Sequence, residues 1–200
     1  MKIMGDSISF QCERCGRCCN PSQFEKDIVH YIPLYLDEVD NIIQLARHNN
    51  LKIDLEPDLM YFDELNQQLI IVTYALRIDN RGCPFYHSGC MIYDQRPITC
   101  KAYPISIFRS NDNTGIILKP ECSFVQKYGV SLKELDYYEM SDVFGNEFPF
   151  SREIQIRGNS ITDQIIELEK FGKIRVPVKL PVEMTEETRN LTQVRLDKIN

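Results

Sequence analysis

The alternation of apolar and polar residues predicts short strands with helices at the periphery. Residues 27–35 are rich in β-branched and aromatic side chains, which indicates a strand. Pro33 restricts that strand to the edge of a sheet, because proline has no N–H to donate to a ladder. Residues 36–50 then follow a helical period, with Asp37 as the expected N-cap. One face of this helix collects the apolar side chains of Val39, Ile42, Ile43 and Ala46.

Two hairpins are predicted in the middle of the chain. The first joins extended segments at residues 59–62 and 69–78 across a polar stretch. The second joins residues 105–108 to 116–119 across a segment rich in turn residues. Between them, residues 79–104 hold three prolines, two glycines and three cysteines, so we expect irregular backbone or short helical turns there.

Cysteine is absent after residue 122, and the pattern there becomes that of ordinary amphipathic segments. Residues 160–172 predict a helix with Ser160 as N-cap and Gly172 as stop signal, and its apolar face holds Ile161, Ile165 and Leu168. Residues 175–184 contain two prolines and are expected to run extended along an edge or surface. Residues 185–200 predict a capped terminal helix.

Together these elements predict an α+β fold with a small, irregular, cysteine-rich core centred on metal, short strands and hairpins around it, and helices outside. Two hundred residues with 43% hydrophobic and 26% charged side chains are typical of a folded globular chain. We expect a metal-binding cysteine-cluster domain at residues 1–125. Residues 126–200 are expected to form a helical and extended C-terminal extension that packs on this domain or docks a protein partner.

Charge and hydropathy narrow the class of protein. The longest apolar run, residues 69–76, is too short to span a bilayer, so no membrane association is expected. The first ten residues lack the apolar centre of a secretory signal, which predicts a cytoplasmic protein with reduced thiols. The net charge of −6 and the lack of a Lys/Arg cluster argue against a nucleic-acid partner.

The eight cysteines carry the candidate chemistry. Four lie within eight positions, and the x2 gaps in the run from Cys12 to Cys18 favour a shared centre. Cys19 breaks this rhythm, and because neighbouring side chains generally diverge, we expect it to face a different partner. The full set is Cys12, Cys15, Cys18, Cys19, Cys83, Cys90, Cys100 and Cys122.

Several explanations fit these thiols. The lack of a secretory signal disfavours a disulfide scaffold, and the lack of a βα context disfavours a thioredoxin-like redox motif. Buried free cysteines would not concentrate four thiols within eight residues. Metal ligation is favoured, because the cysteine-bearing segments at residues 12–19 and 81–101 are net positive within an acidic chain. Eight thiolates can form two sets of four, or one set with four supporting thiols.

The phrases "FQCERCGRCC" and "CPFYHSGCMIYDQRPITCKAYP" resemble the YkgJ-type CxxCxxCC family of zinc- or iron-chelating domains. The resemblance covers roughly residues 8–125, matches all eight cysteines, and includes Tyr93, Arg96, Pro97, Tyr103 and Pro104. A similar cluster in flagellin lysine methylases implies an iron–sulfur cluster and methyl transfer from S-adenosylmethionine.

The sequence therefore predicts a metal-binding protein that holds an iron–sulfur cluster, of the 4Fe–4S type, through its cysteine thiolates. Its role would be electron transfer or cluster-dependent chemistry. Zinc in a structural role is one alternative, and a cluster-dependent S-adenosylmethionine methyltransferase is the other. The sequence singles out no catalytic residue.

Overall fold

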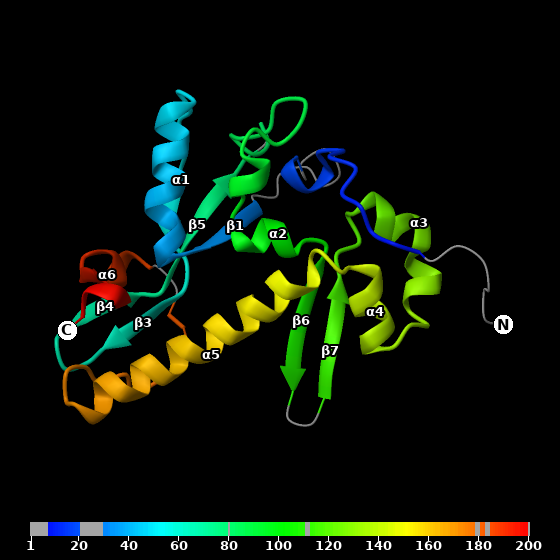
Figure 1. The fold of residues 1–200 in the computed structure, drawn as a ribbon. Coiled ribbons are helices and arrows are strands. Elements are labelled where there is room, and N and C mark those ends of the chain that lie inside the picture. The colour runs from blue at the N-terminus through cyan, green and yellow to red at the C-terminus, as the bar shows by residue number, and fades with distance from the viewer. Residues whose placement is uncertain are drawn as a thin grey trace.

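The structure, a computed structural model, describes residues 8–20, 30–79, 81–110, 113–178, 181–182 and 185–199. It confirms the α+β class, with three small sheets and helices packed around them (Figure 1). Of the predicted first strand, residues 27–29 lie outside the described residues. None of the helices within the described residues is long and apolar enough to cross a bilayer.

The first sheet has the order β1-β5-β2 and carries helix α1. β1 (His30–Tyr35) and β2 (Leu55–Pro57) pair antiparallel with the central strand β5 (Thr73–Ile78). Pro33 thus lies on an edge strand, as predicted. α1 (Leu36–His48) follows β1 directly and buries Val39, Ile42 and Ala46. The helix begins one residue before the predicted N-cap, so Asp37 lies in its first turn.

The second sheet has the order β3-β4-β8. β3 (Met60–Asp63) and β4 (Gln68–Ile71) form the predicted hairpin. The prediction of one extended segment at residues 69–78 is wrong, because β4 ends before Val72 and the next strand, β5, belongs to the first sheet.

β8 (Thr192–Arg195) pairs in parallel with β4, where the sequence predicted a terminal helix. Only α6 (Glu186–Arg189) is helical there, and it is followed by the strand and a 3₁₀ turn, Leu196–Lys198. The parallel pairing partner lies more than one hundred residues away, so the local pattern of this segment did not reveal it.

The third sheet is the hairpin of β6 (Ile105–Ser110) and β7 (Asn113–Leu118), as predicted. It lies beside α3 (Ser123–Leu132) and α4 (Tyr137–Val143) in Figure 1. α2 (Ile98–Ala102) precedes it. The irregular backbone predicted before it is confirmed, with a 3₁₀ turn at Tyr93–Gln95.

α5 (Phe148–Lys170) runs from the β6-β7 hairpin to the second sheet (Figure 1). The predicted start at Ser160 is wrong, since that residue lies inside the helix. Ile165 and Leu168 are buried on the predicted face, and Gly172 ends the helix in the left-handed region at φ +66°. Part of the segment predicted to be extended, residues 179–180 and 183–184, lies outside the described residues.

Four hydrophobic cores organise the described elements, and the smallest of them consists of Met60, Leu69 and Ile71. The first core packs aromatic side chains between the hairpin and α3 to α5, including Phe10, Phe124, Phe144 and Phe148. The second core packs α1 on the first sheet, including Leu34, Ile42, Leu76, Phe85 and Ile92. The third core packs the end of α5 on the second sheet, including Ile70, Val72, Ile165, Leu168 and Leu196. Cysteine-bearing segments contact the first two cores.

Candidate metal centre

The N-terminal cysteine run folds into a tight turn. Gly16 adopts φ +78°, a left-handed conformation that side chains disfavour, and its carbonyl oxygen accepts hydrogen bonds from the N–H groups of Cys19 (3.0 Å) and Asn20 (2.8 Å). The turn at Arg17–Cys19 is a short 3₁₀ helix. This turn contains Cys18 and Cys19, the last two cysteines of the run.

The second cysteine segment docks directly on this turn. The N–H of Cys83 donates to the carbonyl oxygen of Cys19 at 2.6 Å. Gly16 lies against the ring of Tyr86, at a spacing that leaves no room for a β-carbon. The N-terminal cysteine run and the segment that begins at Cys83 are therefore in direct contact without a metal between them.

Four of the eight cysteines pack in or against the first two cores. Cys122 is buried in the first core, and Cys12 packs against it. Cys83 and Cys90 pack against the second core. Cys15 and Cys18 are exposed, so the site has one face open to solvent. The cores thus hold part of the set, while Cys15 and Cys18 are accessible to solvent.

Cys18 is the electrostatic centre of the set. Its hydrogen bond with the Cys19 thiol is the largest cause of its raised pKa, followed by loss of solvation and by the charges of Cys19 and Cys15. Cys18 in turn contributes to raised pKa values at Cys83, Cys90, Cys100 and Cys122. Such effects fall with distance, so Cys18 is close enough to each of these thiols to influence its pKa. Cys12 joins the group through Cys90, whose pKa it raises.

Burial is the largest cause of the raised pKa at each of those four thiols, and it brings Cys83 to about 11. Near neutral pH these groups are therefore protonated when they hold no metal. A metal ion must displace their protons to bind, and its positive charge then stabilises the thiolates.

The vicinal pair differs from the sequence-based expectation. The Sγ atoms of Cys18 and Cys19 are 3.8 Å apart and in hydrogen-bond contact, because the 3₁₀ turn folds the two side chains toward each other. The expected divergence is wrong. All eight cysteines are described and free of disulfides. Among the described residues no three Cys, His, Asp or Glu side chains already converge on one metal position, and ligation by all eight cysteines stays a prediction.

An aromatic ring links both halves of the set. The guanidinium carbons of Arg14 and Arg96 lie 4.1 Å and 3.8 Å from the centroid of the Tyr93 ring. Arg96 also donates to the carbonyl oxygen of Tyr93 at 2.8 Å. Burial raises the pKa of Cys90, and the charge of Arg96 partly opposes this increase. Arg14 adopts φ +52°, a conformation that needs support from its surroundings. The stack brings two cations beside the thiols.

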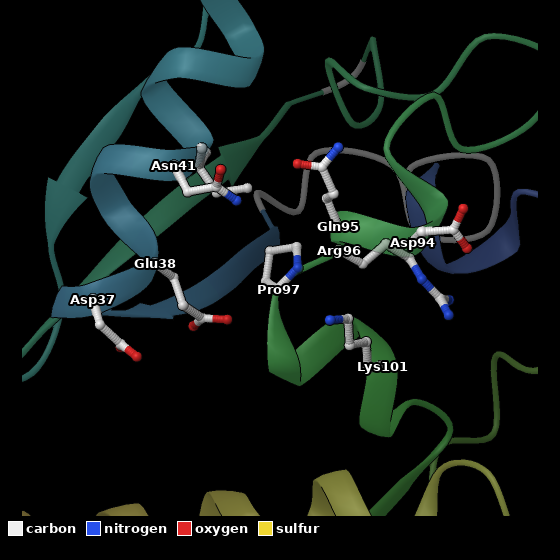
Figure 2. Close-up of a pocket in the computed structure, with 9 residues that line it drawn as sticks. Asp37, Glu38, Asn41, Asp94, Gln95, Arg96, Pro97 and Lys101 are labelled. Atoms are coloured by element: carbon white, nitrogen blue, oxygen red, sulfur yellow. The ribbon is translucent and has the colours of Figure 1, made fainter.

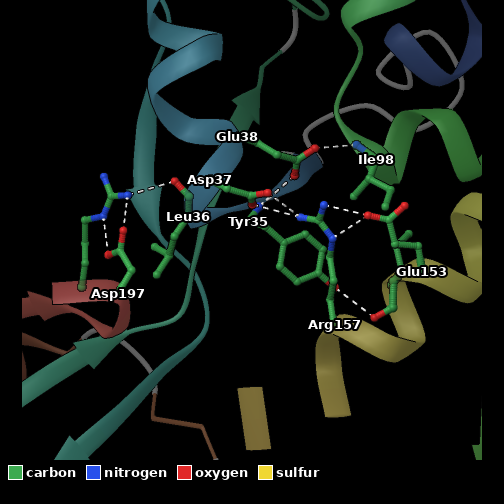
Figure 3. A network of polar contacts seen from close by, with 10 residues as sticks. Tyr35, Leu36, Asp37, Glu38, Ile98, Glu153, Arg157 and Asp197 are labelled. Atoms are coloured by element: carbon green, nitrogen blue, oxygen red, sulfur yellow. Dashed lines mark hydrogen bonds and ion pairs between the residues drawn. The ribbon is translucent and has the colours of Figure 1, made fainter. Parts of the chain in front are cut away.

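A polar network fixes the helix that carries Cys100 (Figure 3). Glu38 on α1 accepts hydrogen bonds from the N–H of Ile98, the first residue of α2, at 2.7 Å and from the N–H of Tyr35 at 3.0 Å. Its neighbour Asp37 pairs with Arg157 on α5, at 2.9 Å. The carboxylate of Glu38 therefore sets where α2 starts.

A pocket of about 300 Å³ lies between α1 and the chain that leads into α2 (Figure 2). Asp37, Glu38 and Asn41 line it from α1, and Arg96 and Lys101 line it from the chain around α2. Lys101 follows Cys100 directly in sequence, but within the part of the chain that the structure describes no cysteine lines the pocket. Its walls carry charges of both signs.

Two buried polar groups near the site were not predicted. The Tyr103 hydroxyl and the Oε2 atom of Glu147 are buried and have no hydrogen-bond partner among the described residues. The resemblance to the family included Tyr103, but the sequence did not indicate that its hydroxyl is buried. Glu147 had no sequence signal, because its burial arises only from the packing of α5 against the first core.

The comparison with known families agrees with this chemistry. Residues 11–123 match the model of the CxxCxxCC family, whose description is "Putative zinc- or iron-chelating domain". The match covers more than half of the chain, which defines a cysteine-cluster, metal-chelating class of domain. The chain belongs to the CxxCxxCC family. No curated protein and no solved structure shows significant similarity to it.

Proposed function

We propose that the protein holds an iron–sulfur cluster, of the 4Fe–4S type, among the thiols around Cys18 and uses it for electron transfer or cluster-dependent chemistry in the cytoplasm. The observation that carries the proposal is a set of eight free thiols on segments that the hydrogen bond from the N–H of Cys83 to the carbonyl oxygen of Cys19 joins. Four thiolates are the ligand set of such a cluster.

The surroundings of the thiols support a cluster with net negative charge. Arg14 and Arg96 lie on Tyr93 next to the set, and cations offset the charge of ligating thiolates. The exposure of Cys15 and Cys18 leaves a face at which an electron could be exchanged with a partner. A protein partner docking on the C-terminal extension stays a prediction.

Zinc is the second candidate, because eight thiols also divide into two tetrahedral four-cysteine sets. Anaerobic purification followed by metal analysis, acid-labile sulfide analysis and a visible spectrum separates the candidates. Iron with equivalent sulfide and a bleachable chromophore is the expected result. Stoichiometric zinc without sulfide, in a colourless protein, would replace the iron–sulfur proposal, and no bound metal of either kind would overturn both.

Single variants then test the arrangement around Cys18. Cys18→Ser is expected to lose all of the metal, because Cys18 affects the pKa of most of the other thiols. If Cys19→Ser also loses everything, one centre uses the vicinal pair. Loss of about half the metal in each variant indicates two centres. Full retention of metal in Cys18→Ser would contradict its central place.

A further inference from the structure

Tyr103 presents a buried hydroxyl that the protein itself does not satisfy. Its oxygen is shielded from solvent and has no hydrogen-bond partner among the described residues, while its ring packs against the first core. A buried hydroxyl without a hydrogen-bond partner destabilises the folded state, so the structure leaves a donor here for which a bound group could supply the acceptor.

Tyr103 lies close to cysteines both in sequence and in the first core. Tyr103 follows Cys100 by three residues, at the end of α2. Cys12 and Cys122 pack in or against the same core. Burial raises the pKa of Tyr103, and the charges of Cys18, Cys122, Glu121 and Cys15 raise it further, in that order. The raised pKa keeps the hydroxyl a neutral donor, and the ring holds it on the core that Cys12 and Cys122 share.

We propose that the Tyr103 hydroxyl donates a hydrogen bond to a ligating sulfur of the metal-loaded centre, and that it is a positioning residue for that centre. A thiolate is an acceptor that the metal-free, protonated thiols do not offer as strongly. Binding of the metal would thus complete the hydrogen bonding of a group left unsatisfied without it. The inference rests on the proposed metal centre, but it holds for iron or zinc.

The test compares Tyr103→Phe with wild type in both the metal-free and the metal-loaded protein. Tyr137→Phe is the matched control, because Tyr137 packs against the same core and its ring contacts Phe148 rather than the thiols. The measurements are the melting temperature of each form and the rate of metal release to a chelator. For an iron-loaded protein, the reduction potential is measured as well.

Metal-free Tyr103→Phe is expected to melt at or above the wild-type temperature, because it loses only an unsatisfied hydroxyl. Its metal-loaded form should bind metal about 10- to 100-fold more weakly and release it correspondingly faster, as removal of partners of metal ligands does. An iron–sulfur cluster should also shift to a more negative potential, since hydrogen bonds to sulfur raise it. Tyr137→Phe should show none of these changes.

Three outcomes would overturn the proposal. Equal destabilisation of the metal-free and metal-loaded forms would show a structural role alone. Unchanged metal release in Tyr103→Phe would show that the hydroxyl does not reach a ligand. Failure of metal-free Tyr103→Phe to fold would show that the hydroxyl has a partner within the protein. A wild-type protein without metal would instead refute the proposed function, which separates the two failures.

Discussion

The N–H of Cys83 lies 2.6 Å from the carbonyl oxygen of Cys19, and this hydrogen bond joins the two segments that carry the cysteines. Gly16 and Tyr86 make the neighbouring contact between the same segments. The closeness of the thiols therefore depends on backbone conformation at a few positions, and substitutions there should affect metal binding without removing a ligand.

Gly16→Ala should destabilise the protein by about 1 to 3 kcal/mol, because the residue adopts φ +78° and a β-carbon would overlap the Tyr86 ring. Metal release should accelerate together with the fall in melting temperature. The control is Gly129→Ala in α3, where a β-carbon meets open space and helix propensity improves. A metal release rate that is the same in both variants would show that this turn does not hold the site together.

Tyr93→Leu should weaken metal binding because it removes the ring on which Arg14 and Arg96 both lie. The loss of two cation–π contacts is expected to cost about 1 to 3 kcal/mol in the metal-loaded protein. Tyr93→Phe keeps the ring face and should behave almost as wild type in melting temperature and metal release. If Phe and Leu are equally harmful, the stack does not support the site and the hydroxyl matters instead.

Glu38→Ala should both lower stability and speed metal release, because Glu38 fixes the first N–H of the helix that carries Cys100. The loss of this acceptor is expected to cost about 1 to 3 kcal/mol. Asp37→Ala is the matched control one residue earlier. It removes an ion pair with Arg157 in which the Asp37 side chain is 65% exposed, so it should cost less than about 1 kcal/mol. Equal metal release from both variants would contradict the role of Glu38.

The elements that were predicted well are those whose signals are local. α1 follows from the spacing of Val39, Ile42 and Ala46, and the β6-β7 hairpin follows from a turn between two apolar segments. The first half of α5 was missed because Pro149, Gly158 and Ser160 weaken the local helix signal. It is stabilised instead by tertiary contacts, such as the hydrogen bond from the N–H of Ile107 to Ser151.

The cysteine spacing identified the eight thiols but not their arrangement. The N–H of Cys83 donates to the Arg17–Cys19 turn, and the charge of Cys18 affects the pKa of Cys100 on α2. Both partners are distant in sequence from the turn. The contact between the Cys18 and Cys19 thiols also depends on that turn, whereas an extended backbone would separate them. Long-range packing therefore decides which thiols meet.

Glu147 should make the protein less stable as the pH rises. Its side chain is buried at the start of α5, and burial raises its pKa to about 7, while Arg96 lowers it and only partly compensates. In the unfolded chain a glutamate has a pKa near 4.5. Between about pH 4.5 and 7 the folded state keeps a proton that the unfolded state releases, so this group reduces stability across that range.

Glu147→Gln should remove this dependence, because the amide stays neutral. Relative to wild type, it should be most stabilising above pH 7, by at most about 3 kcal/mol, and show little difference near pH 4.5. Chemical denaturation of the metal-loaded protein at several pH values measures this difference, in which the contribution of the metal largely cancels. Glu134→Gln, at an exposed position, is the control. A difference between Glu147→Gln and wild type that does not change with pH would show that Glu147 is already ionised in the folded protein.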